Sequence, residues 1–175
     1  MVDGFWRSPD GRESQHALRI GASERGPAAS LRFSMEPIIM LCPGQGAQAV
    51  GMAKAWFDGS PEARAVFERA GAVLAEVWGA DPSTAGLAKL STLCFEGPEA
   101  TLNRTDVSQP AIYVSSVACL AGVKANLGFG NGEMPLAATA GLSLGEYTAL
   151  HVAGAFSFED GLRLVALRGR AMQDA

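Results

Sequence analysis

Histidine and cysteine are scarce in this chain, which limits the chemistry that it can carry. Its 175 residues include two histidines and three cysteines. Cys42, Cys94 and Cys119 have neither the spacing of a zinc site nor that of a disulfide framework, so we expect reduced, mostly buried thiols in a cytoplasmic protein. No apolar run is long enough to span a membrane. We therefore expect no metal centre, no disulfide scaffold and no membrane span.

An excess of positive charge is also missing. The net charge is −4 and the isoelectric point is about 5.2, which argues against nucleic acid and anionic membranes as partners. A hydrophobic content of 48% with 21 glycines is typical of an α/β protein with tight turns. The length is sufficient for one domain with a sizeable core.

Hydrophobic periodicity is missing from residues 1–34, which are rich in Arg, Ser and Gly. This stretch has no apolar h-region, so it is not a secretory signal. We expect a disordered N-terminal extension over residues 1–34 and the folded domain over residues 35–175. The change in composition at Met35 leads to the hypothesis that translation starts there.

The stretch Gly141–Gly145 fits the pattern G-x-S-x-G, with serine at position 143. This pattern places a serine on a sharp turn between a strand and a helix, where its hydroxyl is exposed. The flanks agree, because residues 135–140 are typical of a short strand and residues 144–153 of an apolar helix. Ser143 is therefore a candidate nucleophile for acyl transfer. The alternative is a purely structural turn.

A glycine-rich loop, residues 41–48, follows a short apolar run that predicts a first strand over residues 38–41. The loop fits neither G-x-G-x-x-G nor a Walker A motif, so we expect no nucleotide-phosphate site. Acyl transfer needs one N–H donor after the nucleophile and one from another loop. Here these would be the N–H groups of Leu144 and Gln45. The alternative is an ordinary turn between a strand and a helix.

Four motifs together resemble the family of malonyl-CoA:acyl-carrier-protein transacylases and the acyltransferase domains of polyketide and fatty-acid synthases. They lie at residues 43–48, 108–111, 141–147 and 167–170. The resemblance implies an α/β fold with an α/β-hydrolase-like three-layer core and an inserted ferredoxin-like subdomain, before which we expect this chain to stop. It also implies that a malonyl group passes from coenzyme A to a serine, and then to the phosphopantetheine thiol of acyl carrier protein.

The resemblance assigns a role to five residues. Ser143 matches the acyl-accepting nucleophile, and Gln45 and Leu144 match the oxyanion-hole positions. Gln109 matches a glutamine near the active site, and Arg168 matches the arginine that pairs with the free carboxylate of malonate. Malonyl-CoA is then a substrate, and we expect no permanently bound cofactor. The expected partners are acyl carrier protein and a coenzyme A thioester.

Helical geometry supports the role of Arg168. Ser157 is a typical N-cap followed by acids in the first turn, which predicts a helix beginning there. At 3.6 residues per turn, Arg168 lies between Leu164 and Met172 on an apolar face. A planar guanidinium there suits a carboxylate held by two parallel hydrogen bonds. The alternative is a buried structural ion pair with Asp or Glu.

The chain departs from the family pattern in two ways. Leu142 occupies the place before the nucleophile where the family commonly has histidine, a change that can alter the pocket or the acyl preference. A serine nucleophile also needs a base, usually histidine. His16 lies in the N-terminal extension, and His151 lies about two turns beyond Ser143 on the same predicted helix, pointing away. The family's catalytic histidine comes much later in the chain.

Two other functions stay open at this stage. One is a serine esterase or thioesterase with the same strand–turn–helix motif, against which Arg168 and the Gln45 loop argue. The other is a non-catalytic remnant that binds coenzyme A or a carrier protein, which the lack of a suitable histidine favours for the 175-residue chain itself.

Overall fold

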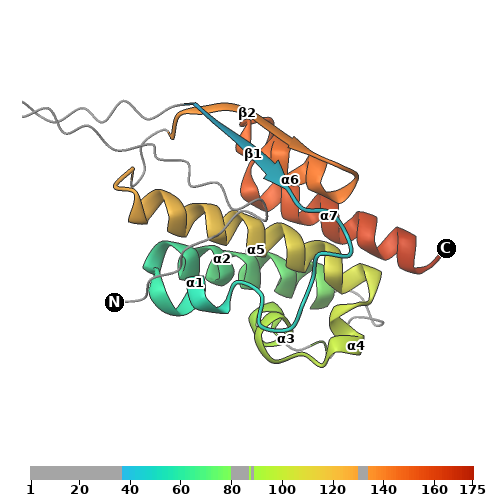
Figure 1. Ribbon diagram of the computed structural model, residues 1–175. Coiled ribbons are helices and arrows are strands. Elements are labelled where there is room, and N and C mark those ends of the chain that lie inside the picture. The colour runs from blue at the N-terminus through green and yellow to red at the C-terminus, as the bar shows by residue number, and fades with distance from the viewer. Residues whose placement is uncertain (1–36, 80–86, 88, 130–133) are drawn as a thin grey trace, which may run out of the picture. The chain divides into compact units, whose positions relative to one another are not determined.

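The computed structural model describes residues 37–79, 87, 89–129 and 134–175, and this part of the chain folds into seven helices and two strands (Figure 1). The expectation for residues 1–34 lies outside the described residues. None of the described helices is long and apolar enough to cross a membrane.

The two strands form a parallel pair, β1 (Ile38–Cys42) and β2 (Leu136–Gly141), close to the predicted bounds. Their register places Cys42 opposite Gly141, so both strands end at the same edge. Helix α6 (Leu144–Val152) follows β2 after a two-residue turn and packs directly against both strands. The segments after the two strands are thereby brought together.

Three long helices form what we call the helical layer: α2 (Pro61–Gly79), α5 (Thr105–Asn126) and α7 (Phe158–Gln173). Helix α5 packs against both α2 and α7, as Figure 1 shows. Spacings of three and four residues put the apolar side chains of each helix on one face. The core between the three helices includes Phe67, Leu74, Tyr113, Val114, Leu162 and Val165.

Local sequence signals mark the start of two of these helices, and the one at Ser157 was predicted above. Ser60 precedes Pro61, and the N–H of Ala63 donates to its Oγ at 3.3 Å. At α7, the N–H of Asp160 donates to the Oγ of Ser157 at 3.0 Å. The remaining helices are α1 (Lys54–Gly59), α3 (Leu90–Glu96) and α4 (Glu99–Leu102).

Helix α5 begins four residues earlier than the proline signal predicts. The sequence places the start at Gln109–Pro110, because proline favours the first turn of a helix. The structure starts α5 at Thr105 and keeps Pro110 inside the helix. The turn before Pro110 is buried, including Val107, Ser108 and Gln109. Packing of this turn outweighs the local cost of the missing N–H group.

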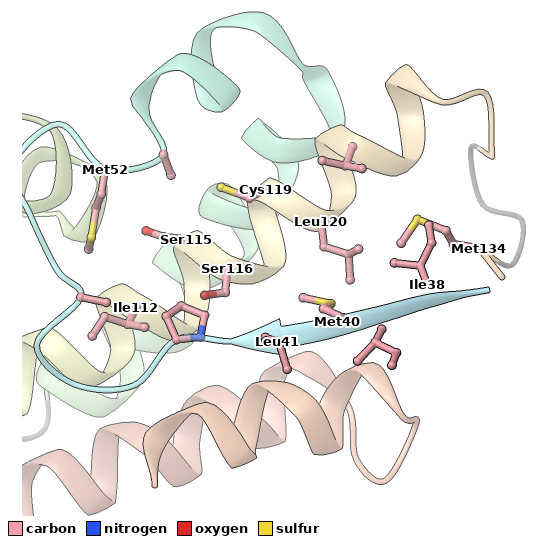
Figure 2. A pocket seen from close by; sticks show the side chains of 15 residues that line it. Ile38, Met40, Leu41, Met52, Ile112, Ser115, Ser116, Cys119, Leu120 and Met134 are labelled. Atoms are coloured by element: carbon pink, nitrogen blue, oxygen red, sulfur yellow. The ribbon is translucent and has the colours of Figure 1, made fainter. Parts of the chain in front are cut away.

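The sheet is less covered than the helices. Ile39 and Leu41 on β1 are 65% and 77% exposed. An apolar groove of about 470 Å³ runs along β1 and faces Ser116 and Cys119 of α5 (Figure 2). Met40 and Leu41 both line this groove, and their side chains leave the strand on opposite sides (Figure 2).

Candidate active site

Ser143 lies in the turn between β2 and α6 with φ of 56° and ψ of −107°. A positive φ is uncommon for a residue other than glycine, and such strain is concentrated at functional sites. The carboxylate of Glu146 accepts the N–H of Ser143 at 2.8 Å, which holds the turn from within the first turn of α6. The serine side chain is exposed beyond the end of the sheet.

Close backbone packing brings the glycine-rich loop against this turn. A Cβ on Gly145 would collide with the carbonyl oxygen of Cys42, so only glycine fits there. A Cβ on Gly44 would lie 3.0 Å from the carbonyl oxygen of Leu142. The loop that carries Gln45 is therefore adjacent to the turn that carries Ser143.

The two backbone N–H groups singled out in the sequence have different surroundings. Leu144 is the first residue of α6, and the first N–H groups of a helix have no acceptor within it. Gln45 lies in the exposed loop, where its side-chain Nε2 donates to Thr105 Oγ1 at 3.5 Å. Both N–H groups belong to segments that meet beside Ser143.

Arg168 reaches Ser143 from α7. Its Nη2 donates to Ser143 Oγ at 2.9 Å, and its Nη1 donates to Gln109 Oε1 at 2.7 Å. The guanidinium also lies 5.7 Å from the centre of the Tyr147 ring, a distance suited to a cation–π interaction. The structure therefore brings together Ser143, Gln109 and Arg168, which lie far apart in the sequence.

The positive charge of Arg168 has no ion-pair partner among the residues that the structure describes: each ion pair found there joins a carboxylate to another arginine or to Lys54. Its neighbours on the apolar face of α7, Leu164 and Met172, are 43% and 48% exposed rather than buried. The guanidinium is thus half-buried at a partly open surface. A cation held only by neutral groups suits an anionic ligand.

Gln109 is fully buried, which explains how it fixes the arginine. Its Oε1 accepts from Arg168, and its Nε2 lies 3.3 Å from the sulfur of Met172. Burial requires the amide to be hydrogen-bonded on both sides, so its orientation is determined. The Oε1 atom that faces the guanidinium is therefore held in place.

His151 and Cys42 have other contacts. The Nδ1 of His151 lies 3.2 Å from the carbonyl oxygen of Phe156, and its ring packs against Tyr113 and Phe158. Burial raises the pKa of the Cys42 thiol, which lies 3.7 Å from Thr139 Oγ1. Within the described part of the chain, neither side chain is hydrogen-bonded to Ser143.

Sequence reasoning gave no role to three side chains near the site. Tyr147 belongs to the nucleophile motif and lies four residues after Ser143, a spacing that shares a helix face. Gln48 belongs to the glycine-rich loop, and its Nε2 donates to Asn103 Oδ1 at 2.9 Å. No signal in the sequence points to Asn103.

Comparison with known families confirms the class that this geometry suggests. The family model described as "Acyl transferase domain" matches residues 39–175. The chain belongs to this family, and the fold is the mixed α/β acyltransferase fold that the resemblance predicted.

Two individual proteins show which members of the family this chain is similar to. The chain is 43% identical over 145 residues to a probable mitochondrial malonyl-CoA-acyl carrier protein transacylase of Drosophila melanogaster, covering 80% of this chain and 33% of that protein. It is 40% identical over 150 residues to the polyketide biosynthesis protein ThaF of Burkholderia thailandensis, covering 85% of this chain and 11% of that protein. The chain therefore spans a third or less of these two relatives.

Solved structures agree. The malonyl CoA-acyl carrier protein transacylase of Clostridium perfringens has a TM-score of 0.63 at 38% identity, over 79% of this chain and 38% of that one. A type II polyketide synthase acyl-carrier protein in complex with its malonyl-transacylase gives a TM-score of 0.61 at 37% identity, over 79% of this chain and 40% of that one.

Proposed function

We propose that Ser143 accepts a malonyl group from malonyl-CoA and passes it to the phosphopantetheine thiol of acyl carrier protein, in fatty-acid or polyketide synthesis. One observation carries the proposal: the guanidinium of Arg168 is bonded to Ser143 Oγ and Gln109 but to no carboxylate of the described residues. An esterase for uncharged acyl groups has no use for such a charge. Relatives named malonyl transacylases support the same activity.

The first half of the reaction forms an acyl-serine. Ser143 Oγ attacks the thioester carbonyl of malonyl-CoA and loses its proton. The oxygen of the tetrahedral intermediate becomes negative, and the N–H groups of Leu144 and Gln45 donate to it. The carbon–sulfur bond then breaks and coenzyme A leaves as the thiol after taking up a proton. In the second half, the carrier-protein thiol attacks the acyl-serine and Ser143 regains its proton.

Arg168 selects the acyl group in this scheme. Before the substrate binds, Nη2 donates to Ser143 Oγ at 2.9 Å. A malonyl group has only one carbon between its carbonyl and its carboxylate, so the carboxylate stays close to the serine and replaces Oγ as the acceptor. Two parallel N–H donors match a carboxylate better than the single charge of lysine does. Gln109 keeps those donors in place by accepting a hydrogen bond from Nη1.

The proton of Ser143 needs an acceptor other than His151. That histidine is the one in the described part of the chain, and its Nδ1 faces the carbonyl of Phe156. A histidine supplied from elsewhere fits the general-base role. A cytoplasmic location is part of the same proposal and is supported by three free cysteines, although the fly relative is described as mitochondrial.

The test is intact-mass spectrometry of the 175-residue chain after incubation with malonyl-CoA or acetyl-CoA, with imidazole added as the external base that the proposed reaction needs. We expect a malonyl adduct that is absent in Ser143→Ala, and little or no acetyl adduct. Arg168→Gln should lose the malonyl preference, because the cation is removed while a hydrogen-bonding side chain stays. Arg163→Gln is the matched control, since Arg163 lies on the same helix but pairs with Glu76.

Three results would contradict the proposal. An adduct that persists in Ser143→Ala would place the nucleophile elsewhere. Acetyl and malonyl adducts that form equally fast would remove the role of Arg168. A folded chain that binds malonyl-CoA without forming any adduct would instead favour the non-catalytic binding function.

A further inference from the structure

Gln48 bonds to two segments of the chain at once. Its Oε1 accepts the N–H of Gly46 at 2.8 Å, and its Nε2 donates to Asn103 Oδ1 at 2.9 Å. Gly46 has φ of 102°, a backbone conformation that residues other than glycine rarely adopt. One amide therefore fixes an unusual bend of the glycine-rich loop and ties that loop to the junction between α4 and α5.

We propose that Gln48 is a positioning residue that aims the N–H of Gln45 at the oxyanion formed on Ser143, an inference that rests on the function proposed above. The reason is the planarity of the peptide bond. The nitrogen of Gly46 and the carbonyl of Gln45 share one peptide plane, so the bond from Gly46 N–H to Gln48 fixes that plane. The N–H of Gln45 lies in the preceding peptide plane with the carbonyl of Gly44, which accepts the N–H of Ala47 at 3.2 Å. Together the two bonds hold the peptide planes on both sides of Gln45, and this restricts the direction of its N–H.

Asn103 gives the loop a fixed support. It is the C-cap of α4, and its own N–H donates to the carbonyl of Glu99 at 2.9 Å. Two residues later, Thr105 accepts from Gln45 Nε2 at 3.5 Å, and its N–H donates to Gln173 Oε1 at 2.8 Å. The glycine-rich loop is thus connected through one junction to α7, the helix that carries Arg168.

A purely structural role for Gln48 makes a different prediction. If the bridge only stabilises the loop, breaking it lowers the free energy of unfolding and leaves the chemistry of the folded chain unchanged. If the bridge aims a transition-state donor, breaking it slows acylation while substrate binding is retained. Loss of one oxyanion donor lowers the rate by about 10²–10³-fold. A donor that is present but poorly aimed keeps part of its stabilisation of the transition state, so we expect a smaller decrease.

The test uses two pairs of variants. Gln48→Leu removes both bonds, whereas Gln48→Glu retains an oxygen that can accept the N–H of Gly46. Asn103→Leu removes the acceptor for Gln48 Nε2. Asn103→Asp retains an oxygen acceptor and should therefore keep the bridge, the protection of Gly46 and the rate of adduct formation. Lys54→Met, which breaks an exposed ion pair with Asp58, is a control for surface change.

Two measurements are made on each variant. Amide hydrogen exchange by ¹⁵N NMR reports on the Gly46 N–H, which we expect to be protected and to exchange at least about tenfold faster in Gln48→Leu and Asn103→Leu. The rate of malonyl adduct formation should fall about tenfold or more in the same two variants. The malonyl-CoA concentration at half saturation should stay within about twofold, as expected when only the transition state is affected.

The outcomes separate this inference from the proposed function. An unprotected Gly46 N–H in the wild-type chain would overturn the bridge. A protected Gly46 N–H with adduct formation unchanged in Gln48→Leu would leave only the structural role and overturn the positioning role. If the wild-type chain forms no adduct, the proposed function fails for this chain, and the exchange of Gly46 in Gln48→Leu still decides whether Gln48 holds the loop.

Discussion

The helical layer and the two-stranded sheet differ in how completely they are buried. Tyr113 and Leu162 in the helical layer have no exposed surface, whereas Cys42 is the one residue of β1 and β2 that is buried. The candidate site lies where these two regions meet. Gln109 and Arg168 belong to the helical layer, and Ser143 follows a strand of the sheet.

This difference suggests that the groups of the site have supports of different stability. The group proposed to hold the substrate carboxylate is anchored in the well-packed region. Ser143 and the glycine-rich loop depend on the less covered region, and the close contact of Gly145 with Cys42 keeps them together. Local stability varies across a fold with the density of buried apolar contacts. We therefore expect the sheet to open more readily than the helical layer.

The largest expected effect on stability comes from comparing the same type of substitution, leucine to alanine, in the two regions. Leu162→Ala in the helical layer should lower the free energy of unfolding by about 2–5 kcal/mol, because it leaves a cavity in a packed core. Leu41→Ala on β1 should change it by about 0.5 kcal/mol or less, because that side chain is 77% exposed. Urea unfolding followed by circular dichroism measures both. Equal losses would remove the contrast between the regions.

The second effect concerns the contact that joins the loop to the nucleophile turn. Gly145→Ala should cost about 1–3 kcal/mol and abolish acylation, because the added Cβ meets the carbonyl of Cys42. Gly71→Ala is the matched control. It lies in α2 with open space around its Cα, so it should stabilise the chain by about 0.8–1 kcal/mol. Thermal unfolding and adduct formation are measured on both, and a stable, active Gly145→Ala would contradict the packing argument.

Thiol labelling compares the opening of the two regions directly. Burial raises the pKa of Cys94 to about 12 and also raises that of Cys42, so neither folded thiol supplies much of the reactive thiolate near pH 8. Each is labelled chiefly through local opening. We expect iodoacetamide to label Cys42 at least about tenfold faster than Cys94, a difference of about 1.4 kcal/mol in opening free energy.

Peptide mapping by mass spectrometry over time provides this measurement. In concentrated urea the two cysteines should react at similar rates, which controls for sequence effects. Faster labelling of Cys94 than of Cys42 in the native chain would reverse the proposed order of stability.

The elements that the sequence predicted well have strong local signals. Ser60 with Pro61 marks the start of α2, and Ser157 marks the start of α7. Ser143 falls between β2 and α6, as the G-x-S-x-G pattern predicts. In each case the signal lies within a few residues of the feature, so no tertiary information was needed.

The features that the sequence missed depend on tertiary contacts. The early start of α5 follows from burial of Val107 and Gln109, which no local pattern reveals. The bridge between Gln48 and Asn103 joins residues 55 positions apart. The resemblance placed Gln109 near the site, but the direct bond to Arg168 across 59 positions needed coordinates. The roles of Ser143 and Arg168 stay predictions until adduct formation is measured.

The smallest expected effect concerns backbone strain at the nucleophile. Ser143 has φ of 56° and ψ of −107°, a sparsely populated conformation that costs a residue with a Cβ roughly 1–3 kcal/mol. Ser143→Ala and Ser143→Gly both remove the hydroxyl, so both should abolish the malonyl adduct. They differ only in the Cβ, so the glycine variant should be more stable by about 1 kcal/mol.

Ala53 is the matched position beside the helical layer. It has φ of 60° before α1 and takes no part in the proposed chemistry, so Ala53→Gly should also stabilise the chain by about 1 kcal/mol, without reducing acylation. Chemical unfolding of the three variants measures the stabilities. If Ser143→Gly is no more stable than Ser143→Ala while Ala53→Gly is stabilised, the backbone at the nucleophile is relaxed. The strain would then not help to fix the direction of the serine hydroxyl, which would depend on the hydrogen bond from the Ser143 N–H to Glu146 and on the bond from Arg168 to Oγ.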